Sequence, residues 1–182
     1  MKHLLDFVFL AILVDVMLRN ASWNRQTLRW RFTLLGVYIA AAIVLWMVGH
    51  WFLIPMQFEN LFPQVYIFTV LGLFGVVRLT SGERLWGSLG QEPDPLLVGI
   101  GVLTLLGVPL HPYAGQMSMV NYLLPTAAAG TGWLAISYVI STLGEELRVE
   151  GVPRLLCGRG GLLIIAGLLY WALMGFFNVH FM

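Results

Sequence analysis

The sequence predicts an all-α membrane protein with six transmembrane helices. Of its 182 residues, 59% are hydrophobic and only 10% are charged, and the mean hydropathy is +0.83. A soluble domain carries roughly 25% charged residues, so this chain has too few charges to cover a surface that faces water. The hydrophobic residues also fall into six runs, which short segments rich in glycine and proline separate.

The lengths of the six runs fit membrane helices. A helix needs about 20 apolar residues to cross the hydrocarbon core. The second, fifth and sixth runs reach that length, the third is slightly short, and the first and fourth are the shortest. The runs cover residues 4–18, 32–54, 64–79, 96–110, 119–143 and 160–181. The chain length fits one domain, so we predict a single transmembrane domain over 1–182, with halves of about 1–80 and 90–182.

Proline marks the ends of the predicted helices. Pro55 and Pro63 flank the second loop, Pro93 and Pro95 lie in the third, and Pro153 lies in the fifth. Proline lacks the backbone N–H that a helix interior requires, so helices tend to end near it.

The basic residues predict the orientation in the membrane. All nine arginines fall in or beside loops one, three and five, and loops two and four contain no lysine or arginine. The arginines are Arg19, Arg25, Arg29, Arg31, Arg78, Arg84, Arg148, Arg154 and Arg159. Loops rich in lysine and arginine stay in the cytoplasm. Loops one, three and five are therefore predicted in the cytoplasm, and both termini on the periplasmic side of a bacterial inner membrane. This alternation requires an even number of spans and therefore supports six.

Six spans divide into two halves of three. Because each half has an odd number of spans, two related halves would have opposite orientations in the membrane and form an inverted repeat. The two shortest runs are the first of each half. Short or interrupted segments at corresponding positions indicate a transporter-type fold, because exposed backbone is tolerated only where it is buried in protein or lines a cavity. We therefore predict a 3+3 inverted repeat with broken first and fourth helices.

Composition excludes several function classes. The net charge of +1 gives no reason to expect a nucleic-acid partner. The single cysteine, Cys157, excludes intramolecular disulfides and four-cysteine metal sites formed by this chain alone. The sequence also lacks a P-loop, a dinucleotide fingerprint, a zinc-protease motif and a nucleophile elbow. The four histidines are His3, His50, His111 and His180. They map to different segment ends without i,i+4 spacing, so no metal or haem site is expected.

Asp15 is the candidate functional residue of the first span. An ionisable group within a span is a functional hypothesis by default. Asp15 and Arg19 are four residues apart and can pair along one helix face. Two interpretations stay open: Asp15 contacts an ion or proton path, or Arg19 neutralises it as a structural charge. Asp6 is expected at the outer interface.

The fifth loop and its flanks form a second candidate site, for docking a partner. This region carries charges of both signs, at Glu145, Glu146, Arg148, Glu150, Arg154 and Arg159. The same residues also fit a solvated loop whose arginines fix the topology.

The last third of the chain resembles a known family. Its motifs are Gly144-Glu145-Glu146-Leu147-Arg148, Val152-Pro153, Gly158-Arg159-Gly160 and Ala172-Leu173-Met174-Gly175-Phe176. They resemble the end of the RnfA/NqrE subunits, and more distantly of the RnfE/NqrD subunits. These are six-helix proteins of the Rnf and sodium-translocating NADH:quinone reductase complexes. The segment Trp51–Pro55 resembles the end of the family's second helix, and segment lengths agree almost end to end.

The chain departs from the family at its cofactor site. The resemblance implies one cysteine after the broken first helix and another within the broken fourth, by which two homologous subunits hold a two-iron two-sulfur cluster. Residues 19–24 and 103–109 contain no cysteine here. Thiolates hold such clusters, so we expect this chain to bind no cluster and no other cofactor.

The resemblance therefore implies a non-catalytic subunit of an Rnf/Nqr-like ion-translocating electron-transfer complex, embedded in lipid and scaffolding a homologous six-helix subunit. Two alternatives stay open. One is a small transporter or channel of inverted-repeat fold, with Asp15 along its path. The other is an accessory subunit of another respiratory or photosynthetic complex.

Overall fold

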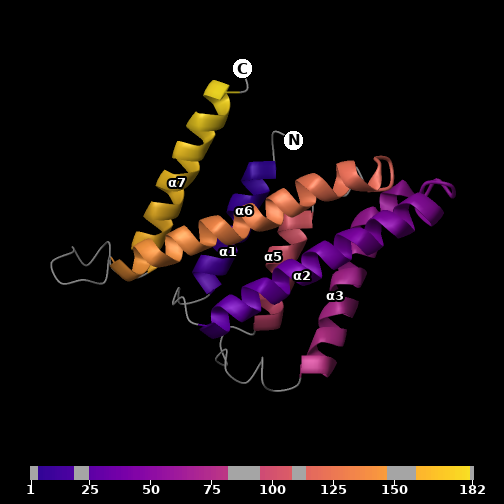
Figure 1. The fold of residues 1–182 in the computed structure, drawn as a ribbon, viewed down its shortest axis with the longest axis horizontal. Helices are drawn as coiled ribbons and strands as arrows, with labels where there is room; N and C mark the ends of the chain where they lie inside the picture. The colour runs from indigo at the N-terminus through magenta and orange to yellow at the C-terminus, as the bar shows by residue number, and fades with distance from the viewer. Residues whose placement is uncertain (1–3, 19–24, 82–94, 108–113, 147–158, 181–182) are drawn as a thin grey trace.

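The computed structural model describes residues 4–18, 25–81, 95–107, 114–146 and 159–180 (Figure 1). These residues form six α-helices and no strand, which confirms the all-α class. The helices are α1 (Leu4–Leu18), α2 (Arg25–Val48), α3 (Phe62–Ser81), α5 (Pro95–Gly107), α6 (Met119–Glu146) and α7 (Arg159–His180). A π-helical turn, η1 (Gly49–Leu53), extends α2, and a short 3-10 turn, η2 (Glu59–Leu61), precedes α3.

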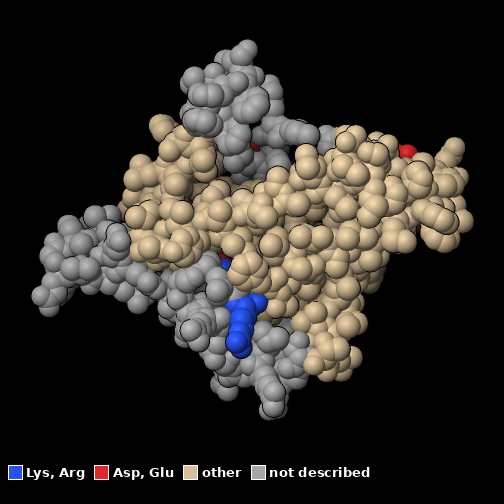
Figure 2. Space-filling view, in the orientation of Figure 1, with Lys and Arg blue, Asp and Glu red and all other residues tan. Residues whose placement is uncertain are grey.

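Three of the described helical segments are long and apolar enough to cross a membrane. They are Arg29–Leu53, Glu59–Thr80 and Met119–Leu143, and two shorter apolar segments are Val98–Gly107 and Gly160–Leu173. On the face that Figure 2 shows, the described side chains are almost all uncharged. These features support a membrane location, while the six-span topology stays a prediction.

Helix α2 begins earlier than its hydrophobic run. The sequence places Arg25, Arg29 and Arg31 in loop one, whereas the structure places them on the first two turns of α2. Residues 25–31 contain neither glycine nor proline, and arginine and glutamine are good helix formers, so the helix extends past its apolar part. Arg29 is exposed, but Arg31 is buried. The assignment of Arg31 to a loop was therefore wrong.

The two short helices lie at the centre of the helix contacts. Helix α1 packs against α5, α6 and α7, and α5 packs against α1, α2 and α3. The two longest helices, α2 and α6, also pack on each other, and α3 and α7 lie toward opposite sides of the molecule (Figure 1). A glycine allows one close approach, since a Cβ on Gly130 of α6 would lie 2.6 Å from Leu35 Cδ1 of α2.

Helix α5 ends inside the protein. Leu103 and Leu106 in its last turns are buried, and their carbonyl oxygens accept hydrogen bonds from Tyr66 Oη (2.8 Å) and Tyr38 Oη (3.2 Å). A carbonyl oxygen has two lone pairs and can accept a hydroxyl bond in addition to a bond within its helix. The two tyrosines thus attach α2 and α3 to buried main-chain carbonyls in the last turns of α5.

Replacing Tyr66 by phenylalanine is expected to lower the free energy of unfolding by about 1 kcal/mol, because the substitution removes one buried hydrogen bond. Denaturation in mixed micelles measures this change. Thr69→Val on the same helix is the matched control, because the Thr69 hydroxyl bonds only to the Val65 carbonyl of its own helix, at 2.7 Å. Equal effects of the two changes would show that the bond from Tyr66 to α5 stabilises the fold no more than a bond within one helix does.

Candidate functional site: a buried ion pair between three helices

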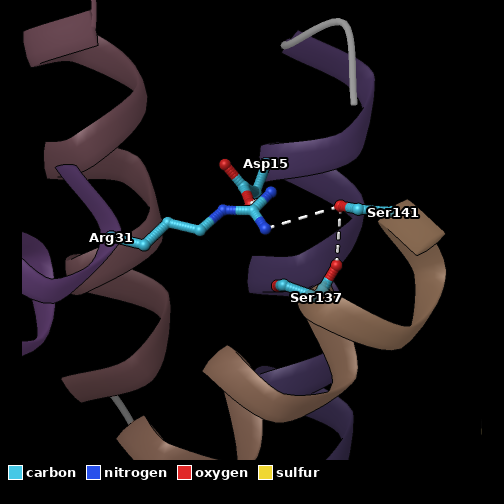
Figure 3. Close-up of polar contacts among 4 residues, drawn as sticks. All are labelled: Asp15, Arg31, Ser137 and Ser141. Carbon is cyan, nitrogen blue, oxygen red and sulfur yellow. Dashed lines mark hydrogen bonds and ion pairs between the residues drawn. The ribbon is translucent and has the colours of Figure 1, made fainter. Parts of the chain in front are cut away.

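An ion pair lies in the interior of the helix bundle. Asp15 Oδ2 of α1 is 2.9 Å from Arg31 Nη2 of α2, and the two side chains are 0% and 5% exposed (Figure 3). Moving each ion out of water costs several kcal/mol even in real proteins, so a buried pair persists only when geometry and added hydrogen bonds compensate.

Helix α6 contributes one added hydrogen bond to the pair. Arg31 Nη1 donates to Ser141 Oγ at 3.4 Å, and Ser141 Oγ donates to the Ser137 carbonyl at 2.8 Å (Figure 3). Ser137 and Ser141 are both buried. The charge pair and this serine therefore connect α1, α2 and α6.

Helical periodicity explains why these side chains point inward. Side chains three, four and seven residues apart share one face of a helix. Asp15 continues a buried face of α1 that contains Val8, Ala11 and Ile12. Arg31 begins the buried face of α2 that continues through Leu34, Tyr38, Ala42 and Leu45.

The other acidic group of α1 has a different partner. Tyr170 Oη of α7 donates to Asp6 Oδ1, and the Tyr170 ring stacks on Phe9 with centroids 4.5 Å apart. Asp6 lies at the opposite end of α1 from Asp15. The two carboxylates therefore do not form one site.

The chain is similar to membrane-complex subunits over most of its length. It is 24% identical over 141 residues to the A subunit of the proton-translocating ferredoxin:NAD(+) oxidoreductase complex of Clostridium ljungdahlii, a match covering 78% of this chain and 73% of the relative. It is 28% identical over 146 residues to the A subunit of the ion-translocating oxidoreductase complex of Salmonella paratyphi B, which covers 77% and 72%. The same values apply to the protein from Salmonella newport.

The resemblance to the Rnf/Nqr family is confirmed. No protein-family model matches the chain, and no solved structure matches it. The chain thus resembles these Rnf-type proteins over about three quarters of its length, while the buried ion pair is an observation on this chain alone.

The predicted pairing of Asp15 with Arg19 falls partly outside the described residues, because Arg19 belongs to 19–24. Within the described residues, Asp15 pairs with Arg31, and its predicted pairing with Arg19 stays a prediction. Sequence reasoning missed Arg31 because it counted this arginine as a topology signal. Its position three residues before Leu34 on the buried face of α2 was the available clue.

The predicted docking residues are described only in part. Glu145 and Glu146 belong to the last turn of α6, and Arg159 is the first residue of α7. Arg148 and Arg154 lie outside the described residues. Docking by these five residues therefore stays a prediction.

The cofactor positions that the Rnf/Nqr resemblance implies are also partly described. The first, 19–24, lies outside the described residues, and the second includes Leu103–Gly107 at the end of α5, where Tyr66 and Tyr38 bond the carbonyls. Within the described ranges, no group of three or more His, Cys, Asp or Glu side chains lies together as metal ligands would. Cys157, His3 and His111 lie outside those ranges.

His50 is the histidine whose side chain is described. Its Nδ1 lies 3.2 Å from the Gly115 carbonyl oxygen, and its ring stacks on Trp46 with centroids 5.1 Å apart. Trp46 Nε1 also donates to the Met117 carbonyl at 2.9 Å. His50 and Trp46 therefore attach the end of α2 to the segment that precedes α6.

Proposed function

We propose that this chain is a non-catalytic membrane subunit of an Rnf/Nqr-like ion-translocating electron-transfer complex, where it scaffolds a homologous six-helix subunit. The observation that carries the proposal is the similarity to the A subunits of two such complexes over about three quarters of the chain. Residues 19–24 and 103–109 contain no cysteine. Because thiolates hold iron–sulfur clusters, the role we assign is structural and includes no bound cluster.

The pattern of helix contacts supports the proposed 3+3 inverted repeat. If α1, α2 and α3 correspond to α5, α6 and α7, the contact of α1 with α6 corresponds to that of α5 with α2. Likewise α1 with α7 corresponds to α5 with α3, and α2 with α3 to α6 with α7. The contacts of α1 with α5 and of α2 with α6 map onto themselves. Two related halves packed about a pseudo-two-fold axis would produce this correspondence.

The ion pair favours the scaffold over a transporter. A transport site at Asp15 would need a carboxylate that can release its partner to an ion. Asp15 instead faces a guanidinium at 2.9 Å, and arginine stays protonated in proteins. The ion pair connects the end of α1 to α2 and α6. It thereby fixes how these three helices lie relative to one another, as a scaffold requires.

Mild-detergent extraction of the tagged full chain from its native membrane, followed by mass spectrometry of bound proteins, tests the proposal. We expect a homologous six-helix subunit together with redox subunits. A chain that is isolated alone, or only as a homo-oligomer, would overturn the proposal. Iron analysis of the isolated chain is expected to give substoichiometric iron, unchanged by Cys157→Ser.

The same extraction tests the docking residues. In the variant Arg148→Gln/Arg154→Gln/Arg159→Gln, we expect the membrane partners to stay bound and a cytoplasmic partner to be lost. Arg29→Gln is the control, because Arg29 is exposed on α2, outside the docking region. Retention of all partners in the triple variant would show that these arginines do not dock one.

A further inference from the structure

Polar atoms on one stripe of α6 are buried without partners. Trp133 Nε1 and Ser137 Oγ form no hydrogen bond with any described residue, and both side chains are 0% exposed. The same holds for the two carboxylate oxygens of Asp15, apart from the ion pair with Arg31. Buried polar groups in native proteins nearly always have a partner, either protein or ordered water.

These groups lie next to one another in the fold. Trp133, Ser137 and Ser141 follow at four-residue intervals, so they occupy one face of α6. Ser141 accepts a hydrogen bond from Arg31. Figure 3 shows the Ser137 hydroxyl on the side of α6 that faces Arg31 and Asp15. The stripe thus begins at the ion pair and continues along α6 into the bundle.

The chemistry of the groups selects the ligand. The indole N–H of Trp133 only donates, a carboxylate only accepts, and the Ser137 hydroxyl does both. An anion would satisfy Trp133 but would be repelled by Asp15. A cation would satisfy Asp15 but would leave Trp133 without an acceptor and would be repelled by Arg31. Water both donates and accepts, so one kind of molecule satisfies all three side chains.

We propose that the stripe of Trp133, Ser137 and Ser141 binds a short chain of internal waters that hydrates the Asp15 carboxylate. One turn of helix rises about 5.4 Å, and hydrogen-bonded oxygens lie about 2.8 Å apart. About one water, which makes two such bonds, therefore connects one residue of the stripe to the next. Such waters would solvate the ion pair in the interior of the bundle, and this inference does not depend on the proposed complex.

The stability of Ser137→Ala distinguishes a hydrated stripe from a dry one. In a dry interior, removing a hydroxyl without a partner leaves the unfolding midpoint unchanged or raises it. In a hydrated interior, the bound water loses a hydrogen-bond partner, and we expect the thermal unfolding midpoint to fall by about 2–4 °C. Thr142→Val is the matched control, since Thr142 is partly exposed on the same helix and donates to the Tyr138 carbonyl of that helix at 3.0 Å. Its midpoint is expected to stay within error of the wild type.

A second measurement uses the unaltered chain and so does not depend on the folding of a variant. The protein, labelled with ¹⁵N-tryptophan and purified with any subunits that stay bound, gives indole N–H signals from seven tryptophans. Loss of one signal in Trp133→Phe assigns Trp133. We expect its indole proton to show a cross-peak to water despite full burial. An indole signal without a water cross-peak, or an unchanged or raised midpoint in Ser137→Ala, would overturn the proposal.

Discussion

Replacing Arg31 by methionine is expected to lower the free energy of unfolding by about 3–5 kcal/mol, the cost of leaving one member of a buried ion pair without the other. Methionine preserves most of the side-chain volume, so the loss reports on charge rather than on a cavity. Asp15 is fully buried and would lose the cationic partner that the structure places at 2.9 Å from it. Denaturation of the purified chain in mixed micelles measures the change.

Two further variants give this prediction its controls. Arg29→Met changes an exposed arginine two residues earlier on α2 and should alter stability by no more than about 0.5 kcal/mol. The double variant Asp15→Leu/Arg31→Met removes both charges and should recover most of the loss, because apolar replacement of a whole buried pair is often neutral or stabilising. A double variant as unstable as Arg31→Met alone would show that the charges are not coupled.

Replacing Gly115 by alanine is expected to lower the free energy of unfolding by about 3 kcal/mol, from two additive effects. Gly115 has φ +83°, a conformation that L-residues with a side chain rarely adopt. A Cβ there would also lie 2.7 Å from Gly49 C and from His50 N. These are backbone atoms of the π-helical turn η1, so a rotamer change cannot relieve the collision.

Gly36→Ala is the control for the glycine prediction. Gly36 lies within α2 on an exposed face, and a Cβ there would meet nothing within 4 Å. Alanine has the higher helix propensity, so this variant should gain about 0.5–1 kcal/mol. A Gly115→Ala variant that unfolds at the wild-type denaturant concentration would show that η1 and the segment before α6 separate at little cost.

The hydrophobic runs predicted most helix positions closely. The first run, 4–18, coincides with α1, and the last, 160–181, differs from α7 by one residue at each end. Long apolar segments bounded by proline and glycine have few alternatives to a helix in lipid, since every backbone group there must bond within the segment. The start of α2 was missed because residues 25–31 are polar, and polarity alone does not end a helix.

The partners of the buried polar groups were decided by the tertiary structure. The sequence indicated that Asp15 needs a cation and offered Arg19, because local spacing reveals only partners three or four residues away. Among the described residues its partner is Arg31, which lies within 2.9 Å because α1 and α2 both pack against α5 and α6. In the same way, only the packing of α2 and α3 around α5 places Tyr38 and Tyr66 at its carbonyls. Hydropathy along the chain thus determined which segments are helical and apolar. Which helix faces meet, and so which charges and hydroxyls pair, depends on side-chain packing between segments distant in the sequence.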